Sequence, residues 1–155
     1  MNRFWVGFAV GTVAGAVLML LLAIVVATSG GQLLEVALHL PDTVELGQPF
    51  EARLTIRNTW QEDVQFHSVD VDDGLLEAFD VEGMDPEPTD SMSLPILDQY
   101  SWFFERDLQP DESIEVWFYL VAVTAGRHVG KFEVCNATQD CAAVVATVFV
   151  TGSAP

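Results

Sequence analysis

An uncharged run near the N-terminus constrains the fold more than any other feature of the sequence. Residues 4–27 read FWVGFAVGTVAGAVLMLLLAIVVA and contain no charged side chain, with Thr12 as the clearest polar residue. As an α-helix this run would be about 36 Å long, against a hydrocarbon core of about 30 Å. We therefore expect a single transmembrane helix over residues 4–27, which takes these residues out of any globular core.

The flanks of this run predict its orientation. Arg3 and the terminal amine are the positive charges on the N-terminal side, whereas the other side carries no Lys or Arg before Arg53. The positive-inside rule then places residues 1–3 in the cytoplasm and the rest of the chain in an extracellular or periplasmic space. The alternative is a cleaved signal peptide ending at residues 25–27, although its apolar core would be longer than usual. Both interpretations put the remaining chain outside the cytoplasm.

Three glycines repeat at four-residue spacing within the expected helix. Gly7, Gly11 and Gly15 would share one helix face and let a second helix approach closely. The helix could therefore contact another copy of itself or a membrane partner. The alternative is that glycine is simply common in membrane helices.

Charge excludes one class of partner. The chain has 23 Asp and Glu against 6 Lys and Arg, for a net charge of −17. We do not expect nucleic-acid binding, because a protein needs clustered Lys and Arg side chains to neutralise phosphates. Disorder is not expected either, since ten Phe and four Trp can supply a core.

The pattern after residue 27 predicts one all-β domain. Residues 28–32 (TSGGQ) read as a flexible linker, and residues 33–155 read as an extracytoplasmic domain. Alternating apolar and polar residues predict strands, whereas residues 83–95 contain three prolines and predict a long loop. The count of seven to nine strands favours an immunoglobulin-like antiparallel β-sandwich. The expected strands are residues 34–40, 50–57, 64–71, 75–81, 100–108, 114–123, 129–135 and 142–150.

Several of these segments resemble one family. Residues 44–50 (VELGQPF) and 54–59 (LTIRNT) are similar to the opening of bacterial CARDB-type domains, which are cell-adhesion-related immunoglobulin-like modules. Residues 108–116 (LQPDESIEV) resemble a later turn and strand of the same domains, although Asp111 stands where glycine is usual. Ala125-Gly126-Arg127, followed by Val129-Gly130, resembles their final turn. The resemblance implies a β-sandwich fold, an extracellular location and, loosely, adhesion or scaffolding.

The two cysteines lie close together, in CNATQDC. An oxidising location favours a disulfide between Cys135 and Cys141, stapling the hairpin of the last two strands. Free thiols and metal binding are the alternatives, but two thiols are too few ligands for a zinc site. Asn136-Ala137-Thr138 also fits the N-glycosylation acceptor.

Acidic residues concentrate in the middle of the chain. Thirteen Asp or Glu and no Lys or Arg lie between Asn58 and Arg106. Asp70, Asp72 and Asp73 could offer oxygens to calcium, although their spacing to Gly74 is not that of an EF-hand. The alternative is a solvated acidic face, which could also dock a basic partner.

No motif predicts catalysis. The histidines at positions 39, 67 and 128 lie in no recognisable nucleophile, phosphate-loop or metal motif, so we expect neither enzyme activity nor a cofactor. Aromatic residues at alternating strand positions could instead form a partner-binding face, unless both faces of their strands are covered. The candidates for this face are Trp60, Trp102, Phe104, Trp117 and Tyr119.

These observations predict a membrane-anchored, non-catalytic β-sandwich module for protein binding, adhesion or envelope assembly. Its partner would be a protein, such as a membrane protein or a second copy of the chain. The alternative is a calcium- or ligand-binding ectodomain that uses residues 70–90.

Overall fold

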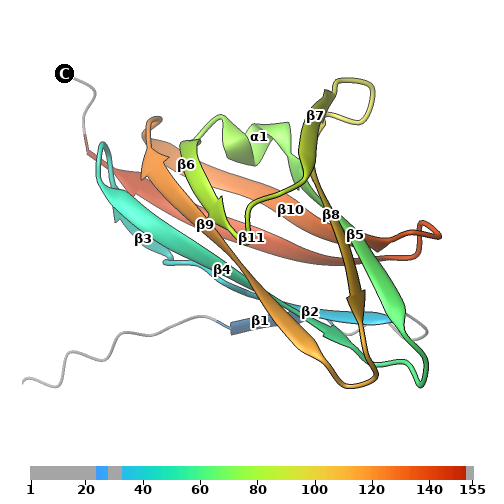
Figure 1. Ribbon diagram of the computed structural model, residues 1–155. Helices are drawn as coiled ribbons and strands as arrows, with labels where there is room; N and C mark the ends of the chain where they lie inside the picture. The colour runs from blue at the N-terminus through green and yellow to red at the C-terminus, as the bar shows by residue number, and fades with distance from the viewer. Residues whose placement is uncertain (1–23, 28–32, 153–155) are drawn as a thin grey trace, which may run out of the picture.

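Strands make up most of the chain in the computed structural model, which describes residues 24–27 and 33–152. They form two sheets that pack face to face; β8 of one sheet and β9 of the other converge on the turn that joins them, at the lower right of Figure 1. One sheet has five strands in the order β1-β2-β4-β9-β6: Ile24–Ala27, Leu34–His39, Pro49–Asn58, Ser113–Ala122 and Phe79–Asp85. The other has six in the order β3-β11-β10-β5-β8-β7: Thr43–Glu45, Cys141–Thr151, Gly126–Asn136, Val64–Asp72, Gln99–Leu108 and Asp90–Leu94. The predicted all-β sandwich is confirmed.

Alternation along the strands builds the core. In β4 the side chains of Ala52, Leu54 and Ile56 are fully buried, while the residues between them face outward. Aromatic rings from the two sheets then meet in the middle. The Phe118 ring of β9 packs 5.6 Å from Trp102 of β8 and 5.5 Å from Phe132 of β10, centroid to centroid. The two sheets are therefore held together by edge-to-face aromatic contacts as well as by aliphatic burial.

The described residues form eleven strands, so the expected count of seven to nine was too low. The strands that were not expected are β1, β3 and β7, which are short or polar. β3 forms where the chain leaves the five-stranded sheet and pairs in parallel with β11, the one parallel pair among the described strands. β7 lies inside the segment predicted as a loop. That prediction is wrong because β7 is a mostly exposed edge strand without an apolar pattern, held by its backbone to β8.

A one-turn helix replaces the start of another predicted strand. α1, Asp73–Leu76, precedes β6, so the strand expected at residues 75–81 begins only at Phe79. Leu75 is buried, and its Cβ lies close above Gly130 of β10. The absence of a side chain at Gly130 lets the helix sit against the sheet.

The N-terminal prediction is tested only at its end. Ile24–Ala27 form β1, paired with β2, so the helix prediction is wrong for these four residues. Three of the four, Ile24, Val25 and Val26, are β-branched residue types, which favour strands. Residues 4–23, including Gly7, Gly11 and Gly15, and the expected linker at 28–32 lie outside the described residues. Within those residues no helix has the length and apolar character needed to span a membrane.

The turn between β8 and β9 contains a residue with a left-handed backbone. Asp111 has φ of 63°, in the left-handed region that glycine favours and that aspartate tolerates better than most residues. Arg57 also contacts the Asp111 carboxylate at 2.7 Å.

Candidate functional site

The outer face of the five-stranded sheet carries an arginine stacked on a tryptophan. Arg53 of β4 and Trp117 of β9 are directly opposite in the register, and the guanidinium carbon lies 5.3 Å from the ring centroid. Glu115, two residues before Trp117 on the same face, contacts the guanidinium at 3.3 Å. The guanidinium therefore covers one face of the Trp117 ring and holds it against the sheet.

A shallow groove of about 420 Å³ lies beside this stack. Its lining comes from three neighbouring strands: β4 supplies Glu51, β9 supplies Tyr119 and Val121, and β6 supplies Glu82. Tyr119 is 39% exposed, which is high for an aromatic residue in a central strand. The groove thus combines an open aromatic surface with two carboxylates.

The predicted aromatic binding face divides into three separate environments. Trp117 and Tyr119 lie on the outer face of the five-stranded sheet, as described above. Trp60 is exposed in the turn between β4 and β5 and borders a different hollow. Trp102 and Phe104 are buried, so their assignment to the face is wrong. Alternation correctly places both on one side of β8, but that side is the core, where Phe104 stacks 4.9 Å from Phe66.

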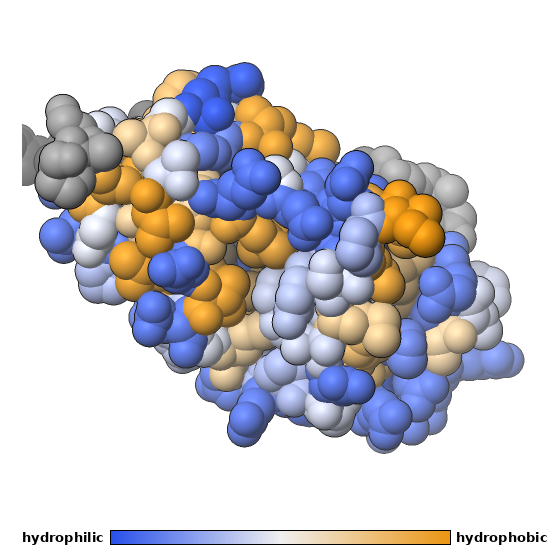
Figure 2. Space-filling model, turned by 90° about the horizontal axis from the view of Figure 1, so that it is seen from above, coloured by the Kyte–Doolittle hydropathy of each residue, from blue (hydrophilic) through white to orange (hydrophobic). Residues whose placement is uncertain are grey.

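The hairpin between β7 and β8 ends in an apolar tip, which we define as residues 95–97. Ile96 is 97% exposed and Leu97 is 62% exposed. Seen from above, hydrophobic residues surface as separate patches among hydrophilic ones (Figure 2). In Figure 1 this hairpin stands at the opposite side of the molecule from β1. Apolar residues next to a proline gave no sign in the sequence that they would project into solvent.

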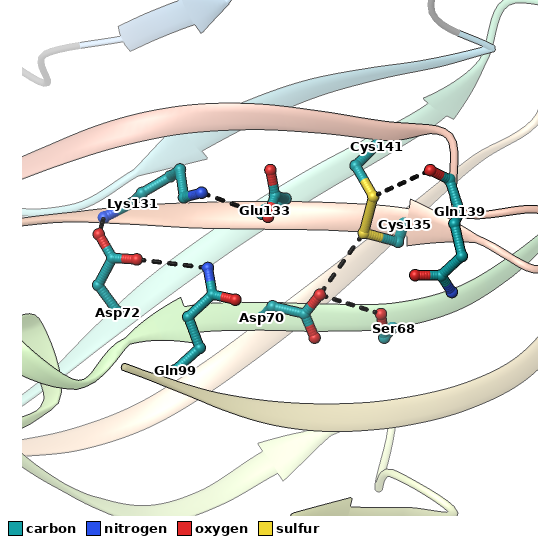
Figure 3. Close-up of polar contacts among 9 residues, drawn as sticks. All are labelled: Ser68, Asp70, Asp72, Gln99, Lys131, Glu133, Cys135, Gln139 and Cys141. Atoms are coloured by element: carbon teal, nitrogen blue, oxygen red, sulfur yellow. Dashed lines mark hydrogen bonds and ion pairs between the residues drawn. A yellow bond between two sulfur atoms is a disulfide. The ribbon is translucent and has the colours of Figure 1, made fainter. Parts of the chain in front are cut away.

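The outer face of the six-stranded sheet carries a polar cluster around the disulfide (Figure 3). The predicted pair is confirmed: Cys135 and Cys141 are directly opposite in the β10–β11 ladder and are bonded, with their Cα atoms 4.1 Å apart. Asp70 of β5 points toward the bond, with Oδ2 3.5 Å from the Cys135 sulfur. Glu133 lies opposite Asp70 in the register and pairs with Lys131 at 3.3 Å. The disulfide thus covers one side of a half-buried carboxylate.

Burial raises the pKa of Asp70 above its ordinary value of 3.8. The hydroxyls of Ser101 and Ser68 lower this pKa in part, and the like charge of Glu133 raises it again. Desolvation penalises the charged form, so Asp70 is an unfavourably placed anion at neutral pH.

The structure does not gather the three predicted calcium ligands. Asp72 already accepts hydrogen bonds from the Lys131 backbone N–H at 2.8 Å and from Gln99 at 3.5 Å. The ligand atoms that come within 4.8 Å of one another belong to Asp70, Glu133 and Cys135, a group that lacks both Asp72 and Asp73. A disulfide sulfur is not a thiolate, so two carboxylates are left, fewer than calcium's usual six to eight oxygens. A calcium site at residues 70–73 stays a prediction.

Asn136 has a structural role at the β10–β11 turn. Its Oδ1 accepts hydrogen bonds from the backbone N–H groups of Thr138 and Asp140 and from the Thr138 hydroxyl, all at 2.9 Å. The residue is buried. Glycosylation at this position stays a prediction.

His67 and His128 are not paired with a potential nucleophile in the described part of the chain. The His128 Nε2 lies 2.9 Å from the Thr124 carbonyl oxygen, and the His67 ring packs 5.4 Å from that of Phe103. Neither forms a hydrogen bond with a serine, and both cysteines are held in the disulfide. The expectation that the protein is not an enzyme stays a prediction.

Comparisons with known proteins identify a fold and no family. No protein-family model and no curated protein matches the sequence. AvmM, described as catalysing macrocyclization in alchivemycin A biosynthesis, superposes with a TM-score of 0.54 at 10% identity, over 86% of this chain and 98% of its own. A cohesin module from a Clostridium perfringens family 33 glycoside hydrolase gives 0.50 at 13% identity, over 77% and 98%. A Salmonella alpha-2-macroglobulin gives 0.50 at 12%, over 76% of this chain and 7% of its own. Such identities show a shared β-sandwich fold alone.

Proposed function

We propose that this protein is a non-catalytic binding module, anchored in a membrane by its N-terminal segment, whose extracytoplasmic domain binds a protein partner in adhesion or envelope assembly. The domain would be an immunoglobulin-like sandwich of the CARDB type. The confirmed disulfide supports an oxidising compartment. The apolar run that precedes Ile24 supports the anchor.

The apolar tip of the β7–β8 hairpin carries this proposal. Burying an exposed side chain such as Ile96 in a partner would contribute about 1.5–3 kcal/mol, which makes it a candidate anchor residue. The tip stands at the opposite side of the molecule from β1, so it would point away from the anchoring membrane. A net charge of −17 also disfavours contact with anionic lipid. A protein partner therefore fits the apolar tip better than a membrane surface does.

Site-specific photo-crosslinking of the full chain in its native membrane tests this function. A photoreactive residue at position 96 should give one discrete protein adduct, because the tip would be buried in the partner. The same residue at Val145, an exposed position of β11, is the matched control and should give none. Leu97→Asp should abolish the adduct at position 96. Equal adducts from both positions, or none from either, would refute the proposal.

Fractionation and protease access test the location. The full chain should stay with membranes through alkaline carbonate extraction, and protease added to intact cells with a permeabilised outer envelope should digest the domain. A chain released by carbonate, or protected until the cytoplasmic membrane is broken, would contradict the anchor or its orientation.

A further inference from the structure

The groove that Tyr119 lines is shaped by an irregularity in the pairing of β6. The register between β6 and β9 shifts between Val81 and Gly83, so a β-bulge carries Glu82 to the edge of the groove. Gly83 lies opposite Tyr119 and offers no side chain; a Cβ there would stand 3.7 Å from Tyr119 Cδ2. The bulge and the glycine together leave the space over the tyrosine ring open.

Carboxylates stand on both sides of that ring. Glu51 of β4 is directly opposite Tyr119 in the register, and Glu82 comes from the strand on the other side. No arginine, lysine or histidine is among the described residues that line the groove. An electron-rich aromatic face between two anions, on a chain of net charge −17, favours a cation.

The neighbouring pair on the same face shows which cation fits such a setting. Arg53 and Trp117 are the next outward register pair after Glu51 and Tyr119, and there the guanidinium lies over the ring with a glutamate at 3.3 Å. The groove repeats the aromatic ring and the carboxylate but has no guanidinium of its own. Arg53 cannot fill it without leaving Trp117 and Glu115.

We propose that the Tyr119 groove binds an arginine side chain presented by an extended segment of the partner protein. The planar guanidinium stacks on the ring while its edges donate to Glu51 and Glu82, a geometry that a lysine ammonium reproduces less well. The groove is shallow and open, so neighbouring backbone of the same segment must add contacts along the sheet. This inference deepens the proposed function and rests on it, because it names the chemistry of the protein partner.

Peptide binding to the full chain in a neutral detergent tests the proposal. The probe is a fluorescent octapeptide with two arginines among Ser and Val, followed by anisotropy; matched peptides replace arginine with lysine or with citrulline, its uncharged isostere. We expect the citrulline peptide to bind at least about tenfold more weakly than the arginine peptide, because it loses both charge-assisted contacts. The lysine peptide should fall between them, and affinity should drop between about 50 and about 500 mM NaCl.

Variants of the groove distinguish specific binding at this site from non-specific attraction of a basic peptide to an acidic protein. Three substitutions should each weaken binding of the arginine peptide at least about fivefold: Tyr119→Ala, Glu51→Gln and Gly83→Val. The valine side chain of the last one would fill the space over the tyrosine ring. Glu105→Gln removes the same charge from an exposed position of β8 and should change binding less than about twofold. Equal losses in Glu105→Gln and Glu51→Gln would overturn the proposal, as would equal binding of the arginine and citrulline peptides or no binding at about 1 mM.

Binding of a neutral oligosaccharide that Tyr119→Ala abolishes, without arginine-peptide binding, would also overturn the proposal in favour of a sugar site. The photo-crosslinking at position 96 reports separately on the proposed function. An adduct there without arginine-peptide binding would remove only this inference. Arginine-peptide binding without any adduct would contradict the proposed function and leave the groove as a site that recognises arginine in isolated peptides.

Discussion

Asn58 is a fully buried polar residue that ties three chain segments together. Its Nδ2 donates to the carbonyls of Glu62 at 2.8 Å and Leu108 at 2.9 Å, and its Oδ1 accepts from the Trp60 backbone N–H at 2.8 Å. Its own N–H donates to the Glu112 carbonyl. One side chain therefore joins the end of β4 to the turn before β5 and to the end of β8.

Replacing this side chain should destabilise the domain strongly. Asn58→Ala takes the partner from the buried Leu108 carbonyl and from the part-buried Glu62 carbonyl and Trp60 N–H, so we expect a loss of about 2–3 kcal/mol in the free energy of unfolding. Urea unfolding followed by tryptophan fluorescence measures the loss. Gln48→Ala, at an exposed turn position, is the control and should stay within about 0.5 kcal/mol of wild type. A similar, small effect for both variants would show that Asn58 does not hold these segments.

Asp70 should make stability depend on pH in a particular direction. Its pKa is raised by burial in the folded state, so between 3.8 and the folded-state value the folded chain binds more protons than the unfolded chain. Its contribution to stability therefore falls as pH rises through that window. Asp70→Asn should gain stability relative to wild type across the same window and then level off. The gain should stay below about 1 kcal/mol, because the carboxyl is only half-buried and solvent screens it.

Urea unfolding of wild type and Asp70→Asn at a series of pH values above 3.8 checks this sign. Glu133→Gln is the matched variant, since removing the neighbouring charge lowers the pKa of Asp70 and should narrow the window. A relative loss of stability in Asp70→Asn as pH rises would mean that Asp70 is a favourable anion.

At the scale of elements, α1 depends on a glycine in another strand. A Cβ built at Gly130 would lie 2.5 Å from Leu75 Cβ and 3.3 Å from Asp72 Cβ. Gly130→Ala should push the helix from the sheet and lower the free energy of unfolding by about 1–3 kcal/mol, as overpacking does. Gly74→Ala, inside α1 with nothing within 4 Å of its Cβ, is the matched control. It should be neutral or slightly stabilising because alanine favours a helix, and an unchanged thermal midpoint in both variants would refute the packing argument.

The β10–β11 hairpin should lose stability on reduction by a modest amount. The disulfide closes a short loop, with a sequence separation of 6, so restraint of the unfolded chain contributes about 2 kcal/mol. Dithiothreitol should therefore lower the free energy of unfolding of wild type by that amount. Without reductant, a Cys135→Ala, Cys141→Ala double variant should have a lower free energy of unfolding than wild type. Dithiothreitol should not change that value. A wild type that is equally stable with and without reductant would show that the bond adds nothing to the fold.

The sequence predicts elements well where burial is one-sided and poorly where it is not. β4 and β9 alternate cleanly, and their predicted ends lie within one residue of the observed ones. β7 is mostly exposed, so it carries no apolar period, and its pairing partner lies across a hairpin. α1 can pack on the sheet because Gly130, more than fifty residues away, has no side chain. Local pattern could not reveal either.

The candidate sites show the same limit. The disulfide was predictable because its cysteines are six residues apart and directly opposite in one hairpin. Alternation placed Trp102 and Phe104 together but could not say which side of β8 meets the other sheet. The Tyr119 groove needs a bulge in β6 beside β9, and the apolar tip needs residues 95–97 to turn outward. Both depend on tertiary arrangement.

At the scale of the whole molecule, excess negative charge opposes folding. The described residues form five ion pairs, and in each of them at least one side chain is more than a third exposed, so each contributes about 0–1 kcal/mol. Against this, 23 acidic residues share one chain with 6 basic ones, and compaction brings their charges together. Because the pairs are few and weak, repulsion should exceed pair attraction at low ionic strength.

Salt should therefore stabilise this protein, although it weakens the ion pairs. Raising NaCl from about 20 mM to about 500 mM shortens the Debye length from about 20 Å to about 4 Å and screens the dispersed repulsion. We expect the thermal midpoint of the full chain in neutral detergent to rise by about 3–6 °C, equivalent to roughly 1–2 kcal/mol. Neutralising exposed acids with Glu105→Gln and Asp107→Asn should raise the midpoint at low salt and reduce its further increase. A midpoint that falls with NaCl would mean that the ion pairs outweigh the repulsion, and would remove the long-range field that we invoke to attract an arginine-bearing partner.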